Sequence, residues 1–129
     1  MSDSQKNFYK KLLGKVAEKC AVKYLKKNKY KILEQNYATH FGEIDIIAKD
    51  NDCYVFIEVK TRTSDKFGEP MEAVTDFKQR HIIRSAQSYL MTNKIDENQI
   101  KIRFDVIEVK SENGKNEINH LKNAFITQA

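Results

Sequence analysis

Two neighbouring apolar segments, GEIDIIAKD at residues 42–50 and CYVFIEVKTR at residues 53–62, constrain the fold more than any other feature of the sequence. Both are rich in β-branched and aromatic residues, which is typical of strands. Their apolar residues are nearly continuous rather than alternating, and strands of this kind need cover on both faces. The two segments therefore predict adjacent strands in a sheet that lies between other layers.

Three charged residues lie inside these apolar segments. A tight turn at Asn51 and Asp52 would place Asp45 directly opposite Glu58, with Cβ atoms about 4.5–5.5 Å apart. Lys60 lies two residues after Glu58, so both side chains point to the same face. The register is an assumption, because a slip of one residue would send the two acids to opposite faces.

Facing carboxylates disfavour each other's ionisation unless a cation lies between them. Mg²⁺ or Mn²⁺ would resolve the repulsion, since both prefer oxygen ligands. Lys60 would then lie beside the metal, where it could orient or deprotonate a water molecule or stabilise a phosphate. Glu18 could supply a third carboxylate. The pattern favours metal-assisted hydrolysis of a phosphodiester, and the alternative is a polar patch in which Lys60 neutralises Glu58.

The remaining elements follow from hydrophobic periodicity. Two adjacent apolar rows predict an amphipathic helix from Phe8 to about Asn28, with Glu18 at the border of its buried face. Further segments predict a strand at 29–39, a helix at about 75–91, a strand at 100–109, and a short strand or irregular edge at 118–126. Residues 63–72 and 111–116 are expected to be loops. The order α-β-β-β-α-β, with a possible final strand, predicts a single three-layer α/β domain over residues 1–129, with a mixed central sheet flanked by helices.

Composition excludes several classes of protein. With 129 residues, 40% apolar and 32% charged, the chain is typical of one folded domain. No apolar segment follows Met1, and no run approaches the length of a membrane span, so we expect a cytoplasmic protein with no membrane partner. Cys20 and Cys53 have no partner motif and are expected to be reduced thiols in or near the core.

Positive charge is concentrated at the start of the chain. The net charge is +5, and residues 1–31 contain ten lysines against Asp3 and Glu18. Such a distribution is a possible footprint for nucleic acid, in which Lys15 and Lys19 would attract phosphates non-specifically. The alternative, which the charge distribution alone favours, is a well-solvated lysine face.

The order of these motifs resembles the PD-(D/E)xK nuclease superfamily. The match consists of Glu18 on the first helix, GEID at 42–45, EVKTR at 58–62, FGEP at 67–70, FKQR at 77–80, RFDV at 103–106 and NAF at 123–125. More closely, the chain resembles small bacterial endonuclease-like proteins related to archaeal Holliday-junction resolvases. Ile44 departs from the pattern, because the superfamily name has proline before the first acid.

This resemblance implies a restriction-endonuclease-like fold, a metal held by Asp45, Glu58 and the Val59 carbonyl, and a catalytic Lys60 with Glu18 as accessory acid. The substrate would be DNA, possibly branched, and the protein a homodimer, because symmetric cutting needs two sites. Arg62 could meet a phosphate or form a surface ion pair. Lys78 and Gln79 could lie near the substrate or be solvated. A nucleic-acid-binding module without catalysis, and a purely structural role for the charges, are the alternatives.

Overall fold

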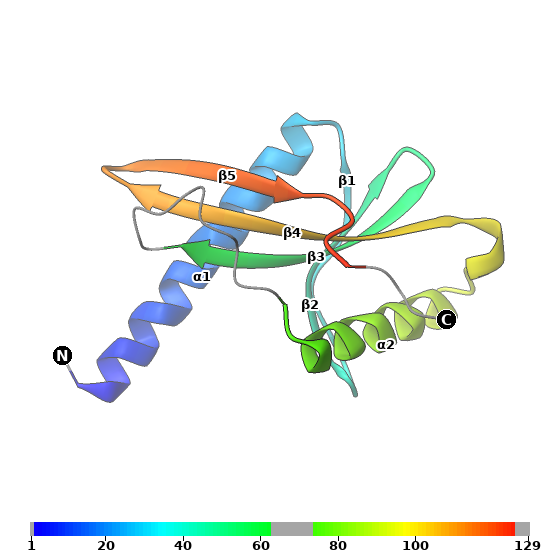
Figure 1. Cartoon of the computed structure of the whole chain (residues 1–129), viewed down its shortest axis with the longest axis horizontal. Helices are drawn as coiled ribbons and strands as arrows, with labels where there is room; N and C mark the ends of the chain where they lie inside the picture. Colours follow the sequence, from blue (N-terminus) through cyan, green and yellow to red (C-terminus); the bar gives the residue numbers. More distant parts are fainter. Residues whose placement is uncertain (1, 63–73, 126–129) are drawn as a thin grey trace.

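The computed structural model describes residues 2–62 and 74–125, in which two helices accompany a five-stranded sheet (Figure 1). The elements are α1 (Asp3–Lys27), β1 (Lys31–Thr39), β2 (Gly42–Asp50), β3 (Cys53–Arg62), α2 (Asp76–Thr92), a 3₁₀ turn (Glu97–Gln99), β4 (Lys101–Glu112) and β5 (Lys115–Leu121). Residues 63–73, including the expected loop and Phe67, lie outside the described residues. The predicted element order is confirmed.

The sheet is mixed, with the strand order β1-β2-β3-β4-β5. Neighbouring strands are antiparallel except for β3 and β4, which are parallel. A parallel pair needs a crossover connection, and α2 lies within that connection. The mixed central sheet expected from the sequence is therefore present.

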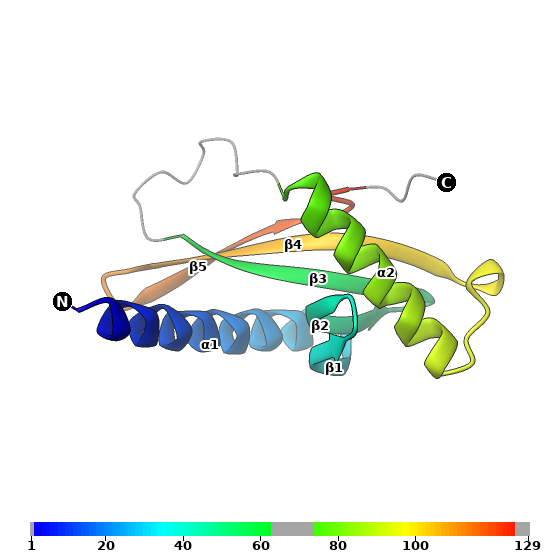
Figure 2. The same cartoon turned by 90° about the horizontal axis from the view of Figure 1, so that it is seen from below.

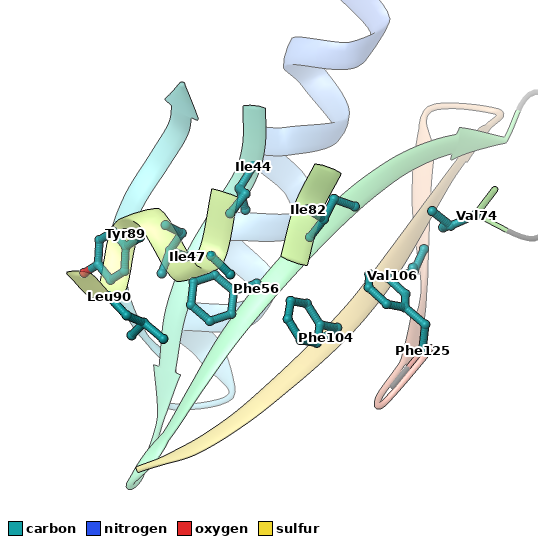
Figure 3. Close-up of a cluster of buried hydrophobic side chains, with 11 residues drawn as sticks. Ile44, Ile47, Phe56, Val74, Ile82, Tyr89, Leu90, Phe104, Val106 and Phe125 are labelled. Carbon is teal, nitrogen blue, oxygen red and sulfur yellow. The ribbon is translucent and has the colours of Figure 1, made fainter. Parts of the chain in front are cut away.

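The two helices cover opposite faces of the sheet. Val55 and Ile57 of β3 point into a core beneath α1, whereas Phe56 between them points into a core beneath α2. Helix α1 runs along one side of β3, β4 and β5 (Figure 2). Figure 3 shows Ile82 and Leu90 of α2 in the second core. The cover on both faces predicted from the apolar strands is confirmed.

The N-terminal half of α1 differs from the prediction. The helix begins at Asp3 rather than Phe8, because Ser2 and Gln5 form a capping box in which each side chain binds the other's backbone N–H.

Neither helix in the described part of the chain is both long enough and apolar enough to cross a membrane.

The expected burial along the first turns of α1 is wrong. Four large apolar residues there are exposed: Phe8, Tyr9, Leu12 and Val16. Only Ala17, Ala21 and Leu25 are buried within the helix. The first turns extend past the strands (Figure 1), so the periodic pattern continues where the sheet no longer covers it.

The end of the sheet also differs from the prediction. Residues 111–116 were expected to be a loop, but β4 continues to Glu112 and β5 begins at Lys115. Asn113 and Gly114 form the tight turn between them, with φ angles of 51° and 75°. Both residue types tolerate positive φ, and the Asn-Gly pair is a strong hairpin signal.

Contacts with the β1–β2 turn fix the position of α2. The Ser85 and Thr39 hydroxyls are 2.7 Å apart, and His81 Nδ1 bonds to the Phe41 carbonyl oxygen. His81 is therefore a packed histidine. These contacts place the first turn of α2 close to the site described below.

A buried polar cluster fastens the last described residues to the sheet. Asp105 accepts hydrogen bonds from the Arg103 guanidinium at 2.9 Å and from the Asn123 backbone N–H at 3.1 Å, and it bonds to His120 Nε2 at 2.7 Å. Burial opposes ionisation, but the bonds from His120 and Arg103 keep the pKa of Asp105 below its usual value. Asp105 therefore joins β4 to β5 and to the residues that follow it.

Candidate active site

The register of β2 and β3 positions the acidic residues. Five pairs run from Asp50 opposite Cys53 to Ile46 opposite Ile57, and they confirm the register predicted from a turn at Asn51. The ladder ends at Ile46 and Ile57, one step before Asp45 and Glu58.

Beyond the last paired residues of β2 and β3, the Asp45 side chain takes the place of a backbone hydrogen-bond acceptor. Asp45 Oδ2 accepts a hydrogen bond of 2.8 Å from the Val59 backbone N–H. Ile44 packs in the core beneath α2, whereas Ile46 packs beneath α1. Residues two apart share a face in a regular strand, so β2 turns sharply at Asp45. The carboxylate consequently reaches across to β3.

Asp45 and Glu58 form a repelling pair. Burial, and then the Asp45 carboxylate, raise the pKa of Glu58 from 4.5 to about 7, although the Lys78 and Lys60 ammonium groups lower it. Burial, with a smaller effect of the Glu43 carboxylate, also raises the pKa of Asp45, against the Val59 N–H, the Lys78 charge and a hydrogen bond with the Glu58 carboxyl group. Two carboxyl groups with raised pKa values side by side are typical of a site that binds a cation or moves a proton.

Two ammonium groups flank this pair from different elements. Lys60 of β3 is half-buried and close enough to Glu58 to lower its pKa. Lys78, in the first turn of α2, has its Nζ 3.6 Å from Glu58 Oε1. The structure therefore brings both Lys60 and Lys78 to the acids.

Glu18 approaches the same pair from α1. Burial, followed by the Asp45 and Glu43 carboxylates, raises the pKa of Glu18, and a contact with the Asn36 side chain and the charge of Lys15 oppose the rise. Since Lys78 comes from α2, Asp45 interacts with side chains from both helices. The turn in β2 at Asp45 explains how one carboxylate is accessible to both layers.

Other residues expected near the site have different partners. The Arg62 guanidinium donates to Glu108 at 2.6 Å, which is the ion-pair alternative. The Gln79 amide donates to the Val74 carbonyl oxygen at 2.8 Å and so helps to close the start of α2. Lys15 and Lys19 lie on the exposed face of α1.

Sequence reasoning missed two residues here. Asn36, which contacts Glu18, has a φ of 50° in β1, and nothing in the local pattern predicts that conformation. Glu108 is only 2% exposed and pairs with Lys60 in the parallel register of β3 and β4. The sequence did contain a signal for Glu108, because it is an acid inside the apolar segment at 100–109.

The oxygen atoms of this site suit a hard divalent cation. Among residues 2–62 and 74–125, no three acidic, histidine or cysteine side chains form a complete metal cluster. Mg²⁺ does not need one, because it commonly binds through one or two carboxylates, waters and substrate phosphates. Asp45, Glu58 and the Val59 carbonyl match this donor set, and a cation would relieve the repulsion within the pair.

The chain matches one protein family over most of its length. The model described as "Uncharacterised protein family UPF0102" matches residues 17–109, a span that includes Glu18, Asp45, Glu58, Lys60 and Lys78. A "UPF0102 protein" of Alkaliphilus oremlandii is 53% identical over 115 residues, or 89% of this chain and 98% of the relative.

Two further relatives carry the same family description. A "UPF0102 protein" of Caldicellulosiruptor saccharolyticus is 49% identical over 119 residues, covering 90% of this chain and 98% of its own length. Another, of Geobacter metallireducens, is 44% identical over 119 residues, covering 92% of this chain and 96% of its own length. The chain therefore belongs to the UPF0102 family.

Proposed function

We propose that the protein is a Mg²⁺- or Mn²⁺-dependent nuclease that hydrolyses phosphodiester bonds in DNA. The observation that carries the proposal is the pair of adjacent carboxyl groups, Asp45 and Glu58, with raised pKa values and two lysines beside them. A polar patch that served only for stability would gain nothing from bringing two buried acids together. The resemblance to PD-(D/E)xK nucleases supports the same conclusion and suggests a restriction-endonuclease-like fold.

Each residue has a role in this proposal. Asp45, Glu58 and the Val59 carbonyl would hold the metal, which would supply Lewis-acid activation of the phosphate and its attacking water. Lys60 orients the water and stabilises negative charge on the phosphate. The Val59 N–H holds the Asp45 carboxylate toward β3. Glu18 supports the metal site from α1.

DNA would meet lysines that come from both helices. Lys78 reaches the carboxylate pair from α2 and can meet a phosphate next to the scissile bond. Lys15 and Lys19 add phosphate attraction that is independent of sequence and falls as salt increases. The resemblance to resolvases suggests that the substrate is branched DNA and that the protein is a homodimer with two sites. The composition suggests that the protein is cytoplasmic.

Divalent-dependent cleavage of a panel of DNA structures tests the proposal. The panel contains single strands, duplexes, flaps, forks and four-way junctions, with Mg²⁺ or Mn²⁺. We expect Asp45→Asn, Glu58→Gln and Lys60→Gln each to lower the cleavage rate by about 100-fold or more. Asp52→Asn is the matched control, because that turn residue has a 72% exposed side chain and should cleave normally.

Three results would contradict the proposed nuclease activity. The first is cleavage that survives all three substitutions, which would indicate a contaminating enzyme. The second is salt-sensitive DNA binding without turnover under either metal, which would favour the non-catalytic binding module. Absence of both metal and DNA binding would leave only a structural role for the charges.

A further inference from the structure

We propose that Lys78 is the internal counter-ion of the Asp45–Glu58 pair, and that a divalent ion must displace its ammonium group to enter the site. The inference rests on the proposed function, since it takes the pair to be the metal site. It goes further by giving Lys78 two alternative partners, a carboxylate in the metal-free protein and a DNA phosphate in the metal-bound protein.

The contact with Glu58 is an ion pair that can be broken easily. Lys78 Nζ lies 3.6 Å from Glu58 Oε1, which is longer than the 2.7–2.9 Å of a tight charge-assisted hydrogen bond. The lysine side chain is 48% exposed, whereas the Glu58 side chain is 13% exposed. Ion pairs with such a solvated partner contribute little to stability, so the ammonium group can leave without disturbing the fold.

The position of the ammonium group is the one that a metal ion would need. Lys78 Nζ is 3.6 Å from Glu58 Oε1, and the Asp45 carboxylate reaches the same part of β3 through its 2.8 Å bond from the Val59 N–H. The ammonium group therefore lies beside the carboxyl pair. A divalent ion brought to the same two carboxylates would be repelled by the ammonium group at short range, so the two cations compete.

Displacement requires only a change in the side chain. The backbone of Lys78 is fixed, because its N–H donates to the Thr75 hydroxyl that caps α2, at 3.1 Å. His81 and Ser85 hold the following turns against the β1–β2 turn. The flexible lysine stem can therefore swing toward solvent while α2 stays in place. There the released ammonium group is available to a phosphate.

Calorimetric titration of the whole chain with Mn²⁺ at pH 8 tests the competition. We expect Lys78→Gln to lower the dissociation constant for Mn²⁺ by about threefold to tenfold, because the competing charge is gone. Arg84→Gln is the matched control: it removes the same charge from the exposed face of α2, where Arg84 lies over the Phe41 ring, and should change the constant less than twofold. Unchanged or weaker binding by Lys78→Gln would overturn the inference.

DNA binding provides a second readout. In Ca²⁺, used in place of Mn²⁺, Lys78→Gln should weaken DNA binding by about twofold to fivefold and make it less salt-dependent. In a chelator the substitution should have no effect, because Glu58 already holds the ammonium group. If Lys78→Gln weakened DNA binding equally in Ca²⁺ and in the chelator, the inference would be overturned.

The two proposals fail in different ways. Mn²⁺ binding that is lost in Asp45→Asn but is indifferent to Lys78→Gln would overturn the displacement and leave the nuclease standing. A wild-type protein that binds no Mn²⁺ at all would overturn both.

Discussion

At the residue scale, Glu58 has a protonation state that couples the site to the stability of the fold. Its pKa is about 7 in the folded protein, against a usual value of 4.5. Between these values the folded state holds a proton that the unfolded state has released. The contribution of Glu58 to stability is therefore complete below about pH 4.5 and is lost as the pH rises through about 7.

Glu58→Gln should remove much of this pH dependence. The neutral amide resembles the protonated acid, so we expect the metal-free variant to gain about 1–3 kcal/mol in free energy of unfolding at pH 8 and little at pH 4. Urea unfolding at the two pH values measures the difference. Glu117→Gln, which changes an exposed acid of β5 away from the pair, is the control. A variant less stable than wild type at pH 8 would refute the repulsion between Glu58 and Asp45.

At the element scale, α1 has two halves with different surroundings. The half from Ala17 to Leu25 packs beneath the sheet, whereas the half before Val16 has exposed apolar side chains. Helices of this length obtain most of their stability from packing. The first half therefore depends on its capping box and on intrinsic helix propensity.

Gly14→Ala should stabilise that first half. Gly14 lies inside the helix, and a Cβ atom added there would meet no other atom within 4 Å. Alanine is preferred to glycine by about 1 kcal/mol in a helix, so amides near residue 14 should exchange with solvent about twofold to fivefold more slowly. Hydrogen exchange measures this.

The matched control is Gly114→Ala, which places the same methyl group where φ is 75°. An L side chain is strained there, so this variant should destabilise the β4–β5 hairpin. Faster exchange around residue 14 in Gly14→Ala would show that the glycine serves a purpose other than helix formation.

At the scale of the whole molecule, β3 belongs to both cores. Phe56 packs beneath α2 and Ile57 beneath α1, and both are fully buried. We expect Phe56→Ala and Ile57→Ala each to cost about 2–5 kcal/mol. Because the strand is shared, each variant should still unfold in one transition, followed equally by circular dichroism and tyrosine fluorescence. Two separate transitions in either variant would indicate independent cores.

Local sequence patterns predicted most of this architecture. The β2–β3 hairpin was predictable with its register, since Asn51 and Asp52 fix the turn and the apolar residues fix the faces. For Lys78 the start of a helix suggested a position near the substrate, but the sequence left a solvated position open as the alternative. These features depend on residues close together in the chain.

Features that depend on distant contacts were not predictable in the same way. The exposure of Phe8 and Leu12 depends on where the sheet ends, which periodicity within α1 cannot indicate. The sharp turn of β2 at Asp45 depends on the Val59 N–H and on packing from both helices. The β4–β5 hairpin is different, because the Asn113–Gly114 signal was present and was overlooked.

The bend that exposes Asp45 to both helices has a consequence for assembly. A chain with only one helix docked would lack either Glu18 or Lys78 beside the paired acids, and would offer a different charge environment to any ion. Under the proposed function Glu18 supports the metal and Lys78 competes with it, so undocking α1 would weaken manganese binding and undocking α2 would strengthen it. Manganese affinity would therefore report which helix has docked.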